Sequence, residues 1–173
     1  MTDDVSIRRA GPGDAETLAA LGAETFTETF GHQYKEEDLS TFLKKNHSPE
    51  VYRRILADEA WAAWLAEDAG GRAGGYVVAG PCGLPVPDMP ENAGEIVRLY
   101  LRESFQGAGL GARLLETALD WLRPRYAPVY LSVYEENPRA QKLYERFGFV
   151  KIRRYFYMVG NHADPEWIME LRR

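Results

Sequence analysis

Hydrophobic positions follow two different spacings along the chain. Where they recur every three or four residues, as at Leu110, Leu114 and Leu115, the spacing predicts an amphipathic helix. Short apolar runs bounded by glycine or proline predict strands instead. The predicted helices cover residues 14–25, 37–45, 48–57, 109–122 and 137–147. The predicted strands cover residues 5–7, 61–67, 72–79, 95–101, 128–134, 149–159 and 167–171.

Helix-capping residues and prolines indicate how these elements are joined. Ser48 followed by Pro49 is a favourable helix N-cap and first-turn pair. Residues 26–35 are expected to be a connection rich in aromatic side chains. Residues 80–94 carry prolines at positions 81, 85, 87 and 90, which deny this segment both a helix and a central strand. Strands with interspersed helices around one mixed sheet predict an α/β (α+β) class, folded as a single domain over residues 1–173.

The composition is that of an ordinary globular protein of 173 residues, 45% of them hydrophobic and 27% charged. The formal net charge of -5 gives no attraction to nucleic acid but suits a cationic substrate. Cys82 is the single cysteine, so no intramolecular disulfide can form, and a reducing compartment, the cytoplasm, is expected. No apolar run approaches about 18 residues, so no membrane span is expected. The N-terminal residues lack an apolar core, so no export signal is expected either.

Three alternating glycines carry the most informative signal. Gly107, Gly109 and Gly111 stand between the predicted strand 95–101 and the strongly amphipathic helix that follows. Glycine lets the backbone adopt positive φ and approach a ligand closely. The free N–H groups at a helix start, beside the positive end of the helix dipole, favour a phosphate or pyrophosphate. The segment is therefore a candidate phosphate-binding loop.

Two common phosphate-binding motifs fit this loop poorly. A P-loop requires a lysine after its last glycine, and none stands there. Gly107, Gly109 and Ala112 do satisfy the G-x-G-x-x-G/A spacing of dinucleotide-binding folds. In those folds, however, the strand runs almost directly into the first glycine, whereas residues 102–106 intervene here. The next strand, 128–134, also ends without the acidic residue that would bind a ribose.

A third motif fits better. Gln106, Gly109 and Gly111 form Q-x-x-G-x-G, which resembles the acetyl-CoA pyrophosphate loop of the GNAT acetyltransferase superfamily. Residues 129–149, VYLSVYEENPRAQKLYERFGF, are similar to the family's next strand and helix, with its Asn-x-x-Ala-x-x-x-Tyr pattern and Gly-Phe ending. The resemblance implies a central mixed, mostly antiparallel twisted sheet with splayed strands, flanked by about four to five helices.

The same resemblance implies what the protein does and how the chain divides. It implies an acetyl-CoA-dependent N-acetyltransferase in which acetyl-CoA is a co-substrate and no metal takes part. Residues 1–94 would form the acceptor-side half, residues 95–150 the acetyl-CoA-binding core, and residues 151–173 the closing strands.

The resemblance also implies roles for specific residues. Tyr144 would protonate the thiolate leaving group, and Glu95 or an ordered water would accept the proton of the amine. The residues implied in cofactor binding are Leu99, Tyr100, Leu101, Gln106, Gly107, Ala108, Gly109, Leu110, Gly111, Ala112, Asn137, Ala140 and Tyr144. Plainer explanations stand beside three of these roles. Asn137 before Pro138 is a good helix N-cap, Tyr144 fits the apolar stripe of its helix, and Glu95 begins a strand.

The acceptor side gives a weaker signal. Residues 23–43 and 155–171 are similar to a bacterial branch related to PaiA-type polyamine acetyltransferases. An acidic stretch could attract a polycation such as spermidine, although a solvated helix face explains it equally well. The expected substrate is a primary amine of a small molecule; a peptide amine, an amino-sugar antibiotic, a protein lysine and a non-catalytic acetyl-CoA sensor remain alternatives. The acidic residues concerned are Glu24, Glu28, Glu36, Glu37 and Asp38.

Other chemistry finds little support in the sequence. His32, His47 and His162 show no metal-ligand spacing, and none of them pairs with Cys82. The resemblance to the GNAT superfamily implies direct attack by the amine in a ternary complex, without an acyl-enzyme, and the absence of a Cys–His pair fits this mechanism. The apolar residues 155–157 of a closing strand offer a surface through which a homodimer could form.

Overall fold

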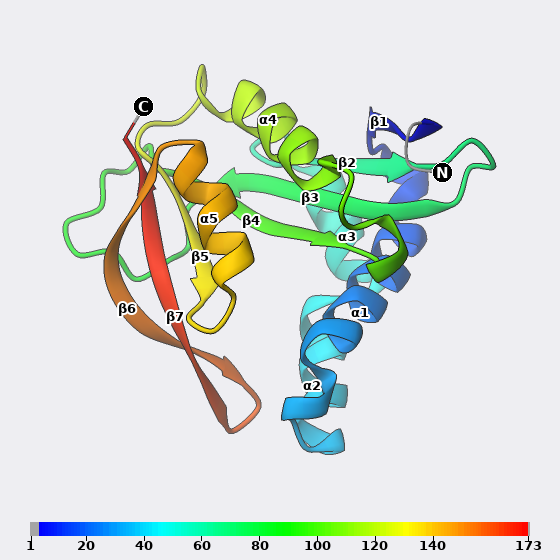
Figure 1. Ribbon diagram of the computed structural model, residues 1–173, viewed down its shortest axis with the longest axis horizontal. Coiled ribbons are helices and arrows are strands. Elements are labelled where there is room, and N and C mark those ends of the chain that lie inside the picture. Colours follow the sequence, from blue (N-terminus) through cyan, green and yellow to red (C-terminus); the bar gives the residue numbers. More distant parts are fainter. Residues whose placement is uncertain (1–3, 173) are drawn as a thin grey trace.

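The computed structural model describes residues 4–172 and is built on a seven-stranded sheet with the order β1-β2-β3-β4-β5-β7-β6 (Figure 1). The strands are β1 (Ser6–Arg9), β2 (Ala62–Glu67), β3 (Ala73–Pro81), β4 (Gly94–Leu101), β5 (Val129–Tyr134), β6 (Phe149–Val159) and β7 (His162–Leu171). The α-helices are α1 (Ala15–Phe30), α2 (Glu36–Asn46), α3 (Pro49–Ala57), α4 (Leu110–Leu122) and α5 (Pro138–Arg146). Only the β4–β5 pair is parallel among the described strand pairs. The predicted mixed, mostly antiparallel α/β class is confirmed.

Strands β4 and β5 part from each other midway along the sheet. They pair only over residues 94–96 and 129–131, and beyond these residues they run in different directions (Figure 1). β4 continues on β3 as far as Leu101, and β5 continues on β7 as far as Tyr134. The predicted splay is thus present, and it opens the sheet near its middle.

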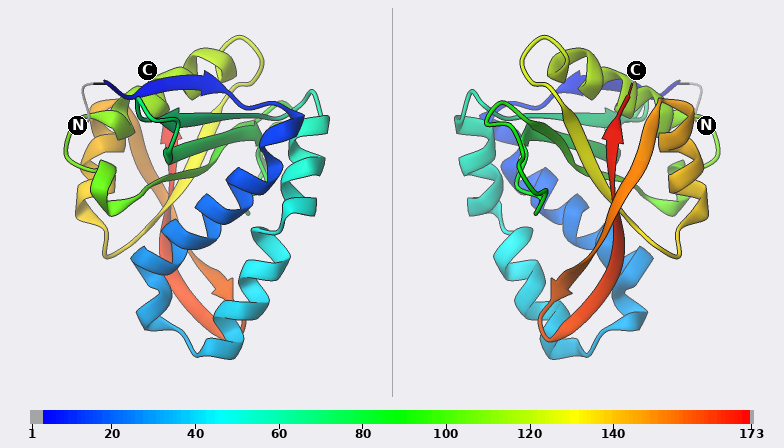
Figure 2. Two further views of the ribbon diagram at one scale, coloured as in Figure 1. Left: turned by 90° about the vertical axis from the view of Figure 1, so that its right-hand side faces the viewer. Right: turned by 90° about the vertical axis from the view of Figure 1, so that its left-hand side faces the viewer.

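The helices cover opposite faces of this sheet (Figure 2). Successive side chains of a strand point to opposite faces. Val77 of β3 packs in the core beneath α4, whereas its neighbour Tyr76 packs in the core formed with α1 and α3. α4 contributes Leu114 and Leu115 to the first of these cores, and both are fully buried. Burial of each leucine contributes roughly 1.5–3 kcal/mol, so this apolar stripe fixes α4 on the sheet.

Helix α1 is longer than the sequence pattern indicated. It ends at Phe30 rather than at residue 25, so the first half of the predicted connection is helical. Phe26 lies 4.6 Å from Phe42 and 5.9 Å from Tyr34 between ring centroids. This aromatic packing stabilises the last turns of the helix, because most helical stability in proteins comes from tertiary contacts.

Strand β7 also begins earlier than predicted, at His162 rather than at residue 167. Asp164 and Pro165 have low strand propensity, which conceals this part of the strand in the sequence. β6 pairs with β7 along its whole length, from Val159 opposite His162 onward, and this pairing overrides the local preference. As a result, the side chain of Asp164 projects from a regular strand.

Strand β6 lies at the edge of the sheet. Its apolar side chains divide between two faces: Phe156 and Met158 are 64% and 53% exposed, whereas Tyr155 and Tyr157 are partly buried on the other face. Only part of the run 155–157 therefore remains as apolar surface. The homodimer stays a prediction.

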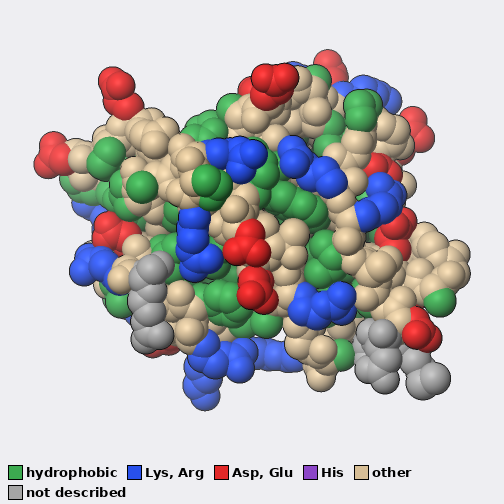
Figure 3. Space-filling model, turned by 90° about the horizontal axis from the view of Figure 1, so that it is seen from above, with side chains coloured by type: hydrophobic (Ala, Val, Ile, Leu, Met, Phe, Trp, Pro, Cys, Tyr) green, Lys and Arg blue, Asp and Glu red, His purple; other side chains and the backbone are tan. Residues whose placement is uncertain are grey.

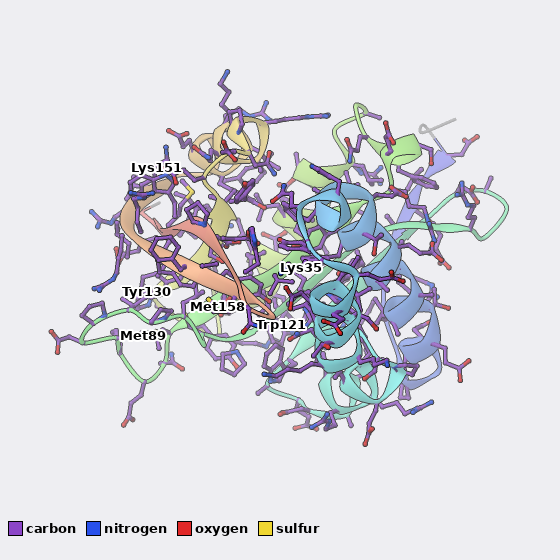
Figure 4. All side chains as sticks on the ribbon, turned by 90° about the horizontal axis from the view of Figure 1, so that it is seen from below. Lys35, Met89, Trp121, Tyr130, Lys151 and Met158 are labelled. Atoms are coloured by element: carbon purple, nitrogen blue, oxygen red, sulfur yellow. The ribbon has the colours of Figure 1, made fainter. Side chains whose placement is uncertain are left out.

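The proline-rich segment folds back onto the sheet. Leu84 and Met89 pack against Tyr130 of β5 and Ile168 of β7, and Figure 4 shows Met89 on the same side of the fold as Tyr130. β3 takes in the first two residues of the segment, through Pro81. Gly94 already belongs to β4, and between these two strands apolar side chains contact the sheet while the rest of the segment is exposed.

Within residues 4–172 no helix is both long and apolar enough to cross a membrane. The face seen in Figure 3 intersperses Lys and Arg with Asp and Glu side chains. The charges of this face therefore largely offset one another.

Candidate active site

A cavity of about 900 Å³ occupies the opening between β4 and β5. Both faces of the sheet contribute to its walls. The predicted site residues that line it are Glu95, Leu99, Tyr100, Leu101, Gln106, Gly107, Gly109, Leu110, Gly111, Ala112, Asn137, Ala140 and Tyr144. Ala108 is the one predicted site residue outside this lining. The fold thus gathers nearly the whole predicted set around one cavity.

The part of the cavity on the α4 and α5 face is the glycine-loop lobe. Its walls are Gln106, Gly107, Gly109, Leu110, Gly111, Ala112, Asn137, Ala140 and Tyr144. Gly107 and Gly109 have φ values of +92° and +75°, a region that favours glycine. Gly109 is the N-cap of α4, so the first N–H groups of this helix have no partner within it. The lobe therefore presents backbone donors suited to an anion.

Gln106 joins the glycine loop to β4 and α5 through two hydrogen bonds. Its Nε2 donates to the carbonyl of Leu101 at 3.3 Å, and its Oε1 accepts from Nη1 of Arg139 at 3.4 Å. Arg139 and Arg146 both line the cavity. The sequence reasoning did not single out these arginines, which add positive charge to the cavity wall.

Tyr144 is 8% exposed on α5 and packs edge-on against Phe149, with 6.1 Å between the ring centroids. Burial raises the pKa of its phenol above the ordinary value, so the hydroxyl remains protonated near neutral pH. Asn137 caps the same helix, because its Oδ1 accepts from the N–H of Ala140 at 3.2 Å. The capping role of Asn137 is confirmed, while its position in the cavity wall leaves a ligand contact open.

The part of the cavity on the α1 and α2 face is the carboxylate lobe. It contains three acidic side chains, Glu95, Asp164 and Glu166. Its aromatic and basic walls are Phe26, Phe30, Tyr34, Phe42, His47, Arg98, Tyr134, Tyr155 and Tyr157. The N-terminal half supplies one side of this lobe, and β5, β6 and β7 supply the other.

Glu95 sits where the two splayed strands are still paired, opposite Tyr130. It is 7% exposed and accepts a hydrogen bond from the N–H of Gly83 at 2.9 Å. Burial raises the pKa of its carboxyl to about 7. Near neutral pH the group can therefore exchange a proton, which a general base requires.

Glu166 and Asp164 are the carboxylates that sequence reasoning missed. Both lie on the part of β7 that was not predicted as a strand. Glu166 pairs with Tyr134 of β5 on one side and Tyr155 of β6 on the other. Burial raises the pKa of Glu166 to about 7, while Asp164 is 4% exposed. An alternating pattern through this stretch was the available signal, and Pro165 obscured it.

Two basic residues share the carboxylate lobe. Burial lowers the pKa of His47 to about 3, and its Nδ1 lies 2.8 Å from the hydroxyl of Tyr52, so its ring is neutral. Arg98 holds its guanidinium over the ring of Tyr52, 5.2 Å from the centroid. Arg98 is therefore the cation of this lobe at neutral pH.

The acidic residues that the sequence offered for the acceptor side lie elsewhere. Glu24 forms an ion pair with Arg102, and Glu28 accepts from the backbone N–H of Glu103 at 3.2 Å. Asp38 accepts from the N–H of Asn161 at the tip of the β6–β7 hairpin, at 3.4 Å. Neither these three nor Glu36 and Glu37 line the cavity. These carboxylates join elements of the fold or face solvent.

Cys82 lies beside Glu95, and burial raises the pKa of its thiol to about 11. The reactive thiolate is therefore scarce near neutral pH. Across residues 4–172, no three or more His, Cys, Asp or Glu side chains gather in a group that could hold a metal ion.

Comparisons with known proteins agree with this geometry. The chain matches the Acetyltransferase (GNAT) family over residues 23–149. It is 27% identical over 171 residues to an uncharacterised N-acetyltransferase in the pepI 3' region of Lactobacillus delbrueckii subsp. lactis, a match that covers 96% of each chain. A spermine/spermidine N(1)-acetyltransferase of Bacillus subtilis is 41% identical over 54 residues, which make up 30% of this chain and 36% of that protein.

A solved structure extends the likeness to the whole fold. The PaiA N-acetyltransferase from Thermoplasma acidophilum, crystallised in complex with coenzyme A, has a TM-score of 0.75 at 20% identity, covering 98% of this chain and 99% of that chain. The family match spans most of the sequence, including the glycine loop and the strand and helix that follow it. The chain therefore belongs to the GNAT family of N-acetyltransferases.

Proposed function

We propose that this protein transfers an acetyl group from acetyl-CoA to a primary amine of a small molecule, by direct attack of the amine in a ternary complex. The observation that carries the proposal is the single cavity that joins an anion-binding glycine loop to a lobe of carboxylates across the splayed strands. One end suits a pyrophosphate and the other suits a cationic amine.

The glycine-loop lobe fits the charged part of acetyl-CoA. The N–H groups at the start of α4, residues 110–112, lack partners within the helix and would bind the pyrophosphate. Beyond residue 96, the β5-facing edge of β4 has no strand partner. The backbone of Leu99 and Leu101 could therefore pair with the pantetheine arm, as a further strand would.

The reacting groups divide between the two lobes. Bound acetyl-CoA supplies an activated thioester. A backbone N–H on the open edge of β4 would polarise its carbonyl, Glu95 would accept the proton of the attacking amine, and Tyr144 would protonate the departing thiolate. The raised pKa of the Cys82 thiol supports direct attack, because an acyl-enzyme would require a thiolate there.

Polyamines are the acceptors that we favour. Glu95, Asp164 and Glu166 contribute three acidic side chains to the carboxylate lobe against one guanidinium, that of Arg98. A cavity lined mainly by one sign of charge raises the local concentration of the opposite sign. The partial match to a spermine/spermidine N(1)-acetyltransferase supports the same class.

Turnover of acetyl-CoA against a panel of amines tests the proposal. Release of free thiol would be followed with spermidine, spermine, simple diamines, aminoglycosides and an N-terminal peptide. We expect turnover with the polyamines and diamines. Turnover only with the peptide would reassign the acceptor to a protein amine. Binding of CoA without turnover on any amine would instead indicate an acetyl-CoA sensor.

Substitution of Gly109 by alanine tests the cofactor loop. We expect CoA affinity to fall about tenfold or more, since a left-handed non-glycine residue costs roughly 1–2 kcal/mol and disturbs the N–H donors beside it. Gly71→Ala is a matched control. Gly71 has a φ of +82° against +75° for Gly109, and a Cβ at either position meets no atom within 4 Å.

Calorimetric titration with CoA, together with thermal unfolding, separates binding from stability. Both variants should lose similar stability, whereas only Gly109→Ala should lose affinity for CoA. An unchanged affinity in Gly109→Ala would remove this loop from the cofactor site.

A further inference from the structure

Asp164 is a buried carboxylate to which the proposed chemistry assigns no role. Its side chain lines the carboxylate lobe, and the residue is 4% exposed. The hydroxyl of Tyr34 donates to Oδ2. The other oxygen, Oδ1, is buried without a hydrogen-bond donor. A buried carboxylate oxygen that lacks a donor is costly unless a ligand supplies one.

One histidine lies close to Asp164, and its other neighbours are aromatic or acidic. Among residues 4–172, His162 on the same strand is the one basic residue with a nitrogen within 4.0 Å of the Asp164 carboxylate. Its Nε2 lies 3.1 Å from Oδ1. That contact lacks hydrogen-bond geometry, since Oδ1 remains without a donor. Tyr157 of β6 lies opposite Asp164 in the strand pairing, and Glu166 is the next residue on the same face of β7. Apart from His162, the surroundings of Asp164 are thus aromatic and acidic.

The spacing of the two β7 carboxylates is fixed by the strand. Asp164 and Glu166 are two residues apart, so their Cα atoms lie about 7 Å apart along β7. Glu166 is the nearer of the two to Glu95, because Glu95 and Glu170 both pair with Tyr130, and Glu166 lies closer than Asp164 to Glu170 along β7. Asp164 lies one step farther along the strand, toward Tyr34 and the junction of α1 with α2.

We propose that Asp164 binds the second ammonium group of a diamine or polyamine whose first amine is acetylated beside Glu95 and Glu166. This inference rests on the proposed function and narrows it to acceptors with two amines. The separation of about 7 Å matches an extended alkyl spacer of roughly four carbons. An ammonium group would donate a charge-assisted hydrogen bond to Oδ1, and the rings of Tyr34 and Tyr157 would face its charge.

Arg98 points to a rival class of acceptor. Its Nη1 is buried without a hydrogen-bond partner, so an acceptor that carried a carboxylate could pair with it. Two observations favour the diamine. The guanidinium already packs over the ring of Tyr52, and the lobe holds three acidic side chains to this one cation. An amine that also bears a carboxylate is therefore tested as the alternative acceptor.

The test compares Asp164→Asn with the unchanged protein on 1,4-diaminobutane and butylamine, which differ by one amine. We expect kcat/KM for the diamine to fall about 10- to 100-fold, mainly through KM, because a charge-assisted hydrogen bond is lost. The value for butylamine should change less than threefold. Glu37→Gln is the matched control: it removes one negative charge from an exposed residue outside the cavity, and should leave both values within threefold.

Several outcomes would overturn this assignment. Equal losses for the diamine and the monoamine, or no loss for either, would show that Asp164 does not recognise the second amine. Preferred turnover of an amine that also bears a carboxylate, abolished by Arg98→Gln, would establish the rival class. If no amine is acetylated, the proposed function fails. Calorimetric binding of 1,4-diaminobutane to the two proteins then still decides whether Asp164 is an ammonium site, and thermal unfolding confirms that Asp164→Asn is folded.

Discussion

Replacement of Tyr144 by phenylalanine is expected to lower kcat about 10²- to 10⁴-fold, the range typical of a lost general acid. The phenol lines the cavity from α5 and is almost fully buried. Burial raises its pKa, so the phenol would keep its proton until the thiolate departs. Phenylalanine preserves the ring contact with Phe149, so the KM for acetyl-CoA should change only a few-fold.

Initial-rate kinetics of thiol release on the preferred amine would measure this effect. Tyr134→Phe is a suitable control, because this tyrosine lines the same cavity but its hydroxyl already donates to Glu136 at 2.7 Å. We expect Tyr134→Phe to retain most of its kcat. A Tyr144→Phe enzyme with kcat within threefold of the parent would place the acid elsewhere, and Tyr155 would be the next residue to test.

Replacement of Glu95 by glutamine is expected to lower kcat/KM about 10²- to 10³-fold at pH 7 and to change its pH profile. A general base acts only when unprotonated. Because the pKa of Glu95 is about 7, the rate of the parent enzyme should rise as pH increases through about 7. The glutamine variant should lose this acid limb, as steady-state kinetics from pH 5.5 to 9 would reveal.

Glu95→Gln, which should lower activity, should raise the free energy of unfolding at high pH. The folded protein holds the Glu95 proton up to about pH 7, whereas the unfolded chain releases it near the ordinary value of 4.5. Stability therefore falls as pH rises through this window, since the folded state binds more protons there. Glutamine removes this loss, so urea unfolding of Glu95→Gln should show a gain of about 1–3 kcal/mol over the parent at pH 8 and less at pH 5.

The Glu166→Gln variant distinguishes the role of Glu166 from that of Glu95. The pKa of Glu166 is also about 7, so this variant should share the pH-dependent gain in stability. It should nevertheless keep the acid limb of the rate profile. If Glu166→Gln loses the limb while Glu95→Gln retains it, Glu166 is the base.

Most of the fold follows from local patterns. Helix α4 was predictable because its leucines recur at helical spacing, and glycine at position 109 marks its start. The glycine loop and the strand and helix that follow it are continuous in sequence, so their motifs predicted the side of the cavity suited to a cofactor. Hydrogen bonds and caps there join residues close in the chain, such as Asn137 and Ala140.

The carboxylate lobe depends on contacts between distant segments, which no local pattern contains. Pairing with β6 makes a strand of residues that include Pro165, and this places Asp164 and Glu166 in the cavity. The proline-rich segment brings the N–H of Gly83 to Glu95, and burial among such segments sets the pKa of that carboxyl. The sequence by itself revealed the candidate cofactor loop, because the residues of that loop are neighbours along the chain. Only the tertiary structure revealed the proposed acceptor side, because strand register and burial there bring together residues of α1, β4 and β7.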